Sequence, residues 1–339
     1  MKPPQPNSQD ETFQTLILKH VSRTFALTIP QLPSPLNRTV SNAYLLCRIA
    51  DTIEDDPTLT FEEKHFFSKW FASLVEQYQP ANEFAEKLLA KLGSESTQAE
   101  KELIKQSESV LKITHSLNNN ERAAMLDCIQ AMTTGMVKYQ GHETLEGLEN
   151  QEEMDLYCYY VAGVVGVMLT KLFIEYGNSW NQDTKNKMTE LAISFGQGLQ
   201  MTNIIKDFWV DRERGACWLP RSIFEPIGVS LKKIDVEDIW KFKLGINLLI
   251  EIAYTHLINA LEYTLIVPKN EKGIRMFCLW AILMATLTLS KIKNSNEFIK
   301  GKNVKISRKT VGLVIFFSSL CNKSNLAIRM LFKLTTLRI

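Results

Sequence analysis

Apolar residues recur every three or four positions along most of this chain, a spacing typical of α-helices that bury one face. The pattern covers five long runs, residues 61–78, 121–139, 154–176, 185–209 and 234–265. Turn-forming residues separate these and the shorter runs, at Pro80, Gly93, residues 118–120 and 177–178, Pro220 and Pro268. Alternating patterns typical of strands are short and few. The sequence therefore predicts an all-α protein.

The length and composition favour one large helical domain. The chain has 339 residues, of which 45% are hydrophobic, and this is enough for a sizeable core. We find no internal repeat, low-complexity tract or linker-like shift in composition. Residues 1–12 are polar and contain no apolar run of the kind that a signal peptide needs. We predict a disordered lead-in over residues 1–12, an all-α domain over 13–310 and a basic amphipathic segment over 311–339.

Charge is distributed unevenly along the chain. The formal net charge is only +2, but eleven Lys/Arg and one acidic residue, Glu297, follow position 289. An acidic body with a basic end argues against a nucleic-acid partner, and it favours an anionic cofactor or a membrane surface near the C-terminus. The six cysteines form no CxxC motif, so we interpret them as reduced core thiols of a cytosolic protein.

Residues 196–220 contain a polar face on an otherwise apolar helix. Gln200, Asn203, Asp207 and Asp211 follow one another at helical spacing, while the opposite face is apolar. Two carboxylates one turn apart repel each other. A solvated acidic face is the simpler interpretation of a single such pair.

A second pair favours a binding site instead. Asp51 and Asp55 repeat the spacing, with Glu54 beside them and Arg48 one turn earlier. Mg²⁺ takes one or two carboxylates and completes its octahedron with water and phosphate oxygens. We therefore expect two acidic helices to face each other across a cavity and to hold a diphosphate through metal ions, so that diphosphate becomes a leaving group.

Two other segments add candidate groups. Arg23 precedes the first acidic helix and has the fork geometry that grips phosphate, although an ordinary surface arginine is an equal alternative. Tyr44 shares a helix face with Arg48, Asp51 and Asp55. Tyrosines also cluster at Tyr157, Tyr159 and Tyr160; such rings stabilise a cation and their hydroxyls relay protons, but a core role is the more frequent one.

Taken together, these segments resemble the squalene and phytoene synthase family. The resemblance rests on SRTFALTIP, YLLCRIADTIEDD, YCYYVAGVVG, LQMTNIIKDFWVDRERG and the following WLP, in this order. Weaker similarity at residues 276–289 and 303–309 points to the squalene branch. The resemblance implies an all-α prenyl-synthase fold with a central cavity between two Asp-rich helices. It also implies head-to-head condensation of two farnesyl diphosphates through presqualene diphosphate, with NADPH-dependent reduction to squalene.

The resemblance assigns roles to individual residues. The metal ligands that it implies are Asp51, Glu54, Asp55, Asn203, Asp207 and Asp211. The substrate contacts are Ser22, Arg23, Phe25, Tyr44, Arg48, Val161, Gln200, Asn203, Lys206 and Arg214. Tyr157 matches the tyrosine that handles the proton in the first half-reaction. The catalytic residues that the resemblance implies are Tyr157, Asp51, Asp55, Asp207 and Asp211. Phe277, Cys278, Lys305 and Arg308 match the NADPH contacts of the squalene branch.

Departures from the family pattern concern mainly the reductive half-reaction. Lys206 stands where animal and fungal enzymes carry arginine, and Tyr159 replaces a histidine. Ala281 and Ile282 stand where those enzymes have proline and glutamine, and Ser307 interrupts the basic segment. No GxGxxG motif occurs, so NADPH would bind outside a Rossmann fold. A product without the reduction step, namely dehydrosqualene, phytoene or presqualene diphosphate, is the alternative.

The C-terminal segment leaves two interpretations open. Its most apolar run, residues 311–320, is about half of the roughly 20 residues that span a bilayer. It is either a last helix packed on the domain or a basic amphipathic helix on anionic lipid. We expect a monomeric cytoplasmic protein, with a peripheral contact to the inner face of a membrane.

Overall fold

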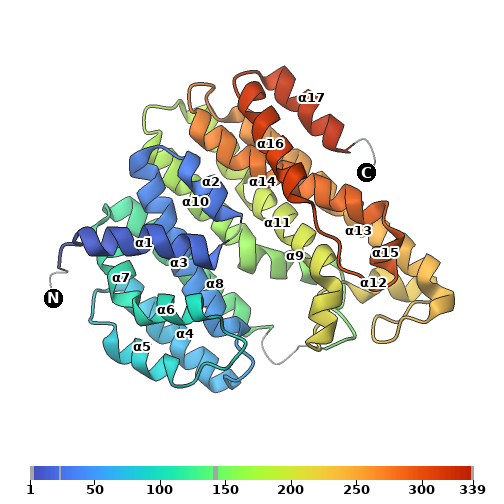
Figure 1. The fold of residues 1–339 in the computed structure, drawn as a ribbon, viewed down its shortest axis with the longest axis horizontal. Helices are drawn as coiled ribbons and strands as arrows, with labels where there is room; N and C mark the ends of the chain where they lie inside the picture. Colours follow the sequence, from blue (N-terminus) through green and yellow to red (C-terminus); the bar gives the residue numbers. More distant parts are fainter. Residues whose placement is uncertain (1–3, 23, 140–143, 337–339) are drawn as a thin grey trace. The chain divides into compact units, whose positions relative to one another are not determined.

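The computed structural model describes residues 4–22, 24–139 and 144–336 (Figure 1). Within these ranges the regular structure is helical, with two isolated β-bridges and no strand, which confirms the all-α prediction. Contacts within the chain divide it into two compact units, where the sequence predicts one domain over 13–310. Unit 1 comprises Met1–Gly141 and Val167–Trp180, and unit 2 comprises His142–Gly166 and Asn181–Ile339. Helix α10 (Val164–Tyr176) has residues in both units.

Unit 1 is built around helix α3, which packs against α1, α4, α6, α7 and α8. At the centre, the buried amide of Asn42 donates to the carbonyl of Val110 at 2.9 Å and accepts from Thr114 Oγ1 at 2.8 Å. The helices of this unit are α1 (Ser8–Val21), α2 (Phe25–Thr28), η1 (Ile29–Gln31), α3 (Ser34–Asp55), α4 (Phe61–Glu76), α5 (Asn82–Leu89), α6 (Gln98–Lys105), α7 (Ser107–Ser116) and α8 (Asn119–Val137).

The start of α1 differs from the expected lead-in over residues 1–12. The helix begins at Ser8 because Asn7 Oδ1 accepts hydrogen bonds from the backbone nitrogens of Gln9 and Asp10, and the Asp10 carboxylate accepts from Asn7 N. This capping box satisfies backbone donors that would otherwise be unpaired. Polar residues that look like a disordered tail are here the cap of a helix.

Unit 2 is built around the long helix α11, which packs against α9, η2, α13 and α14. The apolar periodicity of residues 185–209 and 234–265 predicts its two longest helices, and the structure confirms both. The elements of this unit are α9 (Gln151–Cys158), the π-helical turn η2 (Tyr159–Gly163), α11 (Gln182–Glu213), α12 (Arg221–Phe224), η3 (Glu225–Ile227), η4 (Val236–Asp238), α13 (Ile239–Ile266), α14 (Lys272–Lys293), α15 (Asn296–Ile299), α16 (Arg308–Cys321) and α17 (Asn325–Thr336).

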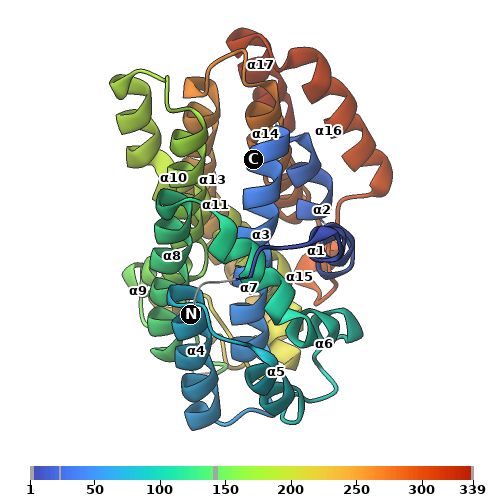
Figure 2. The same cartoon turned by 90° about the vertical axis from the view of Figure 1, so that its left-hand side faces the viewer.

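The last two helices of unit 2 cover α14. In Figure 1 and Figure 2, α16 and α17 lie beside each other along this helix, and all three are in contact. Val314, Ser318, Ile328 and Phe332 are buried. The Trp280 indole of α14 donates to Ser318 Oγ at 2.7 Å. The inner faces of α16 and α17 are therefore packed on the unit, which is the first of the two interpretations of this segment.

Three segments are long and apolar enough to cross a membrane: Gln151–Tyr176, Val236–Ile266 and Lys272–Lys293. The most apolar part of α14 is 72% buried inside the protein, as expected for a helix at the centre of a unit. The six cysteines are free thiols; five of them are buried, as the core interpretation predicts, and Cys321 is half-buried.

Candidate functional site

The first acidic group lies at the C-terminal end of α3. Asp51, Glu54 and Asp55 occupy the last two turns of this helix, where Asp51 and Glu54 are half-buried and Asp55 is exposed. Loss of hydration and the neighbouring Asp55 carboxylate raise the pKa of Asp51 to about 7. The same two causes raise the pKa of Glu54. The Lys64 ammonium opposes this rise and donates to the Glu54 carbonyl.

These raised pKa values reflect burial first and repulsion between the carboxylates second, so the surroundings do not fully compensate the charged forms. A bound divalent cation would supply the missing charge. Carboxylate oxygens are also the donors that Mg²⁺ prefers. Among the described residues, no group of three or more His, Cys, Asp and Glu side chains could hold a metal on its own. An ion held here would need water and phosphate oxygens to complete its shell.

Arg48 lies one turn before this cluster and is held by a residue that sequence reasoning missed. Its guanidinium forms an ion pair with the buried Glu100 of α6 and lies 4.0 Å from an oxygen of Asp51. Arg48 Nε is buried and has no hydrogen-bond partner among the described atoms, so a donor remains for a ligand. The only sequence signal at Glu100 is a Thr-x-x-Glu capping box at 97–100, which predicts a helix start and nothing more.

Three further predicted substrate contacts of unit 1 come together near α3. Ser22 Oγ accepts from Phe25 N at 3.0 Å, and the Tyr44 hydroxyl donates to the Val21 carbonyl at 3.0 Å. The Phe25 and Tyr44 rings lie with their centroids 5.2 Å apart. Tyr44 precedes Arg48 by one turn of α3, so this group is continuous with the acidic end of the helix. Arg23, the predicted phosphate contact of the same segment, lies outside the described residues.

The second acidic group lies near the C-terminal end of α11. Asp207 and Asp211 are half-buried, and the Lys206 ammonium lies 3.1 Å from an oxygen of Asp207. Lys206 also donates to Asn203 Oδ1 at 2.9 Å. Gln200 lies half-buried one turn before Asn203, and Arg214 is exposed just after the helix. The structure thus gathers the predicted residues of this segment into one polar end of α11.

Tyr157 stacks on a second aromatic residue, Trp218, which follows α11 in the chain. It is buried on α9, and its ring stacks on that of Trp218 at a centroid distance of 4.3 Å and an angle of 4°. Gln197 of α11 donates to the Asp155 carbonyl of α9 at 3.1 Å, which links the two helices. Sequence reasoning missed Trp218, whose only signal is its place in the WLP triplet.

Val161 belongs to the π-helical turn η2 that follows α9. Such turns occur frequently at functional sites because they shift the following residues around the helix axis. Tyr159 and Tyr160 lie in the same turn, with their rings edge to face at 5.3 Å. Val161 is half-buried, so its side chain is positioned by the turn without being enclosed.

The four predicted NADPH contacts fall into two dissimilar pairs. Phe277 and Cys278 are buried in α14, and burial raises the pKa of the Cys278 thiol to about 12. Lys305 and Arg308 are exposed, Lys305 in the segment before α16 and Arg308 as the first residue of that helix, and the Lys305 carbonyl accepts from Lys291 Nζ at 2.6 Å. The exposed cations fit phosphate groups, but the buried pair offers no open surface to a nicotinamide ring. These four residues by themselves do not fit a complete cofactor site.

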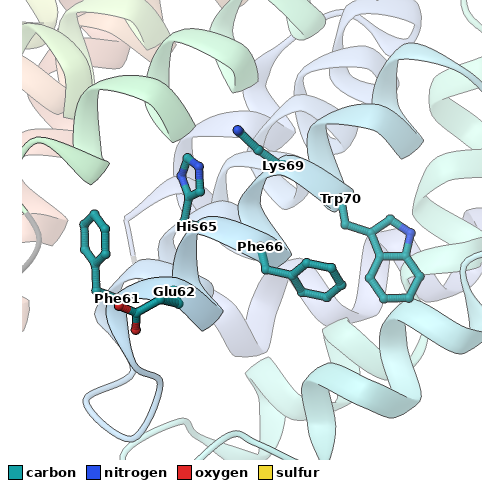
Figure 3. Close-up of a pocket in the computed structure, with 6 residues that line it drawn as sticks. All are labelled: Phe61, Glu62, His65, Phe66, Lys69 and Trp70. Carbon is teal, nitrogen blue, oxygen red and sulfur yellow. The ribbon is translucent and has the colours of Figure 1, made fainter.

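A pocket of about 450 Å³ lies elsewhere, along α4 (Figure 3). The side chains that line it all belong to this helix: Phe61, Glu62, His65, Phe66, Lys69 and Trp70. The Phe61 and His65 rings stack at a centroid distance of 6.4 Å. None of the predicted site residues lines this pocket, so it does not belong to the acidic groups. The predicted cavity between the two acidic helices involves both units and stays a prediction.

The wholly helical architecture, with an aspartate pair near the end of one helix in each unit, defines the class of the all-α isoprenoid synthases. A model of one family within this class matches residues 18–310. The chain belongs to the squalene/phytoene synthase family. This confirms the family that the five sequence motifs indicate.

Individual relatives agree with this assignment. Squalene synthase ERG9 of Saccharomyces cerevisiae is 30% identical over 89% of this chain, and squalene synthase of Homo sapiens is 29% identical over 86%. The solved structure of TcSQS with the ligand BPH1237 has a TM-score of 0.81 and 25% identity, covering 98% of this chain and 91% of that one. The chain spans slightly less than two thirds of the two curated relatives, 66% and 65% of their lengths.

Proposed function

We propose that this chain condenses two farnesyl diphosphates head to head through presqualene diphosphate and reduces that intermediate to squalene with NADPH. The observation that carries the proposal is that the same arrangement of charged side chains occurs twice in a chain of this family. Each unit has two aspartates one turn apart with a cation beside them, Arg48 in unit 1 and Lys206 in unit 2. Squalene synthases of yeast and human resemble this chain over most of its length.

In the first half-reaction, the acidic groups would hold Mg²⁺ through Asp51, Glu54 and Asp55 on α3 and Asn203, Asp207 and Asp211 on α11. Mg²⁺, when bound, neutralises the diphosphate as it leaves. Arg48, with an unpaired buried Nε, would add positive charge beside the first acidic group, and Lys206 would do so beside the second. Ser22, Arg23, Phe25, Tyr44, Gln200 and Arg214 complete the proposed substrate contacts.

After diphosphate leaves, an allylic cation must react with the second substrate before water reaches it. The double bond of the second farnesyl group attacks, a proton is lost and a cyclopropane ring forms. Either the Tyr157 hydroxyl or the released pyrophosphate accepts that proton. Stacking on Trp218 fixes the plane of the Tyr157 ring, which supports a role that needs a defined hydroxyl position. Val161 lies on the neighbouring turn and would shape the wall for the prenyl chain.

For the reductive step, Lys305 and Arg308 offer exposed cations to the phosphates of NADPH, whereas Phe277 and Cys278 are buried. The second candidate function therefore stops before reduction and releases dehydrosqualene, phytoene or presqualene diphosphate. Both candidates share the acidic groups and differ only in the product. Product analysis with and without NADPH separates them.

The test uses purified protein with farnesyl diphosphate and Mg²⁺, and it measures pyrophosphate release together with the extracted prenyl products. We expect squalene with NADPH and presqualene diphosphate without it. Asp51→Asn and Asp207→Asn each remove one ligand charge at nearly constant volume and should lower coupling at least about a hundredfold. Asp183→Asn is the matched control, because Asp183 is exposed on α11 and pairs only with Lys187.

Near-normal coupling by either site variant at saturating Mg²⁺ would contradict the metal assignment. Equal losses in Asp183→Asn would show that the effect is a general one of charge on α11. We further propose that the protein acts as a monomer in the cytoplasm and contacts the inner face of a membrane, because its prenyl product is insoluble in water.

A further inference from the structure

The outer faces of α16 and α17 expose large apolar side chains to solvent. The exposed fractions range from 45% at Phe317 to 69% at Leu326. We call this set the C-terminal apolar face; its members are Leu313, Phe316, Phe317, Leu320, Leu326, Met330 and Leu334. Soluble monomers rarely expose contiguous apolar side chains on this scale without a partner.

The spacing of these residues shows that each helix presents one continuous apolar stripe. Leu313, Phe316, Phe317 and Leu320 lie at i, i+3, i+4 and i+7 of α16. Leu326, Met330 and Leu334 lie at i, i+4 and i+8 of α17, again along one side. The buried residues of α16 and α17 lie at other positions of each helix, so each stripe lies on a different face from the one that packs on the unit.

The opposite faces of the same helices are firmly held, so the exposure is not that of a loosely attached tail. Ser318 is buried and bonded to the Trp280 indole, and Thr335 Oγ1 lies 2.9 Å from Thr286 Oγ1. The buried Arg275 of α14 donates to the Asn322 carbonyl at 2.8 Å and to Asn325 Oδ1 at 2.6 Å. The C-terminal apolar face is therefore a rigid feature of unit 2.

Exposed cations accompany the C-terminal apolar face. Lys309, Lys323 and Lys333 lie on α16, in the turn after it and on α17. Among the described residues, none of these three has a carboxylate within ion-pair distance. Arg329 is the exception, since it pairs with Glu262. The sequence from residue 290 onward contains eleven Lys/Arg and one acid, so this surface keeps an excess of positive charge.

We propose that the C-terminal apolar face docks on an anionic lipid surface, with its apolar stripes in the headgroup–acyl boundary and its lysines on the lipid phosphates. Apolar stripes flanked by cations are the pattern of helices that lie in a membrane interface. A second copy of the chain fits less well, because an isologous contact would bring the unpaired lysines of both copies together. The proposal names the surface for the membrane contact proposed above and rests on that part of the proposed function.

The test measures binding of the full chain, without substrate, to vesicles of phosphatidylcholine alone or with phosphatidylglycerol. We expect binding to the anionic vesicles, weaker binding at high salt, and little binding to phosphatidylcholine. Phe316→Ser with Leu320→Ser should lower the partition coefficient at least about tenfold. Lys323→Glu with Lys333→Glu should lower it by a similar factor, and more at low salt.

The matched control is Trp240→Ser with Leu244→Ser, which removes two exposed apolar side chains from α13 of the same unit. We expect this variant to bind vesicles as the unchanged protein does. Equal loss in the control would show that binding is not specific to the C-terminal apolar face, and it would overturn the proposal. So would a dimer in light scattering that Phe316→Ser with Leu320→Ser converts to a monomer, with no vesicle binding in either form. Because no step requires catalysis, an inactive but vesicle-binding protein would refute only the proposed reaction.

Discussion

Adjacent acidic residues at the end of α3 have different structural roles. Asp56 follows the proposed ligands Glu54 and Asp55, yet its carboxylate is directed at another part of unit 1. It accepts from Thr58 N at 2.9 Å, Gly93 N at 3.0 Å and Ser96 Oγ at 2.5 Å. Asp56 therefore fastens the end of α3 to the loop between α5 and α6, which positions the acidic group without joining it.

Asp56→Asn should lower the stability of the protein and change its dependence on pH. Although burial raises it, hydrogen bonds from Ser96 and Thr58 hold the pKa of Asp56 below its usual value. Because the folded pKa is the lower one, the stabilisation is complete above the unfolded pKa of about 3.9 and is lost as the pH falls through the folded value. We expect the free energy of unfolding to fall by about 2 kcal/mol near neutral pH, because the substitution weakens charge-assisted hydrogen bonds.

Thermal unfolding near pH 7 and near pH 3 checks this prediction. The difference in unfolding free energy between the unchanged protein and Asp56→Asn should shrink near pH 3. At that pH the unchanged protein loses the stabilisation from its charged carboxylate, which the variant lacks at every pH. Asp127→Asn is the control, since Asp127 is exposed in the same unit and pairs only with Lys171. A constant difference at all pH values would assign the effect to side-chain shape instead of charge.

At the scale of elements, small residues determine how closely α11 approaches η2 and α10. A Cβ atom on Gly196 would lie 2.1 Å from the Ala162 carbonyl oxygen, and one on Gly166 would lie 2.2 Å from that of Ala192. Both neighbours are backbone atoms of helices, so they do not move aside easily. The close contact brings the helix of Asp207 and Asp211 beside the turn that carries Val161.

Gly196→Ala should destabilise the protein by about 3 kcal/mol, because the added methyl group forces two helices apart. Gly312→Ala is the matched control, since a Cβ at Gly312 of α16 meets nothing within 4 Å. That variant should gain about 0.5–1 kcal/mol from the higher helix propensity of alanine. Urea unfolding of both variants measures these changes. Changes of opposite sign in the two variants are the diagnostic result, and a stabilised Gly196→Ala protein would contradict the close packing.

At the scale of the molecule, contacts between distant parts of the chain complete unit 2. Arg275 is fully buried and donates to the Val267 carbonyl at 2.8 Å, as well as to Asn322 and Asn325. One side chain thus joins the end of α13, the start of α14 and the turn between α16 and α17. Burial lowers the pKa of Arg275, and the acceptors around it are carbonyl oxygens.

Arg275→Met should destabilise the protein by about 3 kcal/mol, because three buried acceptors lose their donor. It should also loosen the turn between α16 and α17, which amide hydrogen exchange would detect as faster exchange in both helices. The control is Arg329→Met, because Arg329 is exposed and its pair with Glu262 should contribute less than about 1 kcal/mol. If the two variants lose equal stability, the buried hydrogen bonds do not have the importance that we assign to them.

The local part of the site is readable from the sequence. The spacing of Asp51 with Asp55 and of Asp207 with Asp211 places each pair on one helix face, because helix geometry depends only on the intervening residues. Periodicity likewise predicts the long helices around them. The resemblance assigns NADPH contacts to Phe277 and Cys278, and the structure buries both, as the core interpretation of the cysteines predicts for Cys278.

The sequence by itself determined the helices, the family and the two acidic groups, since each depends on residues close together in the chain. Only the tertiary structure decided which side chains from distant segments hold the site residues in place. Glu100 meets Arg48 across 52 positions, and Trp218 stacks on Tyr157 from another segment. The tertiary structure also decided that α16 and α17 are buried on one face and exposed on the other. Such contacts depend on where distant segments pack, and no spacing pattern encodes that packing.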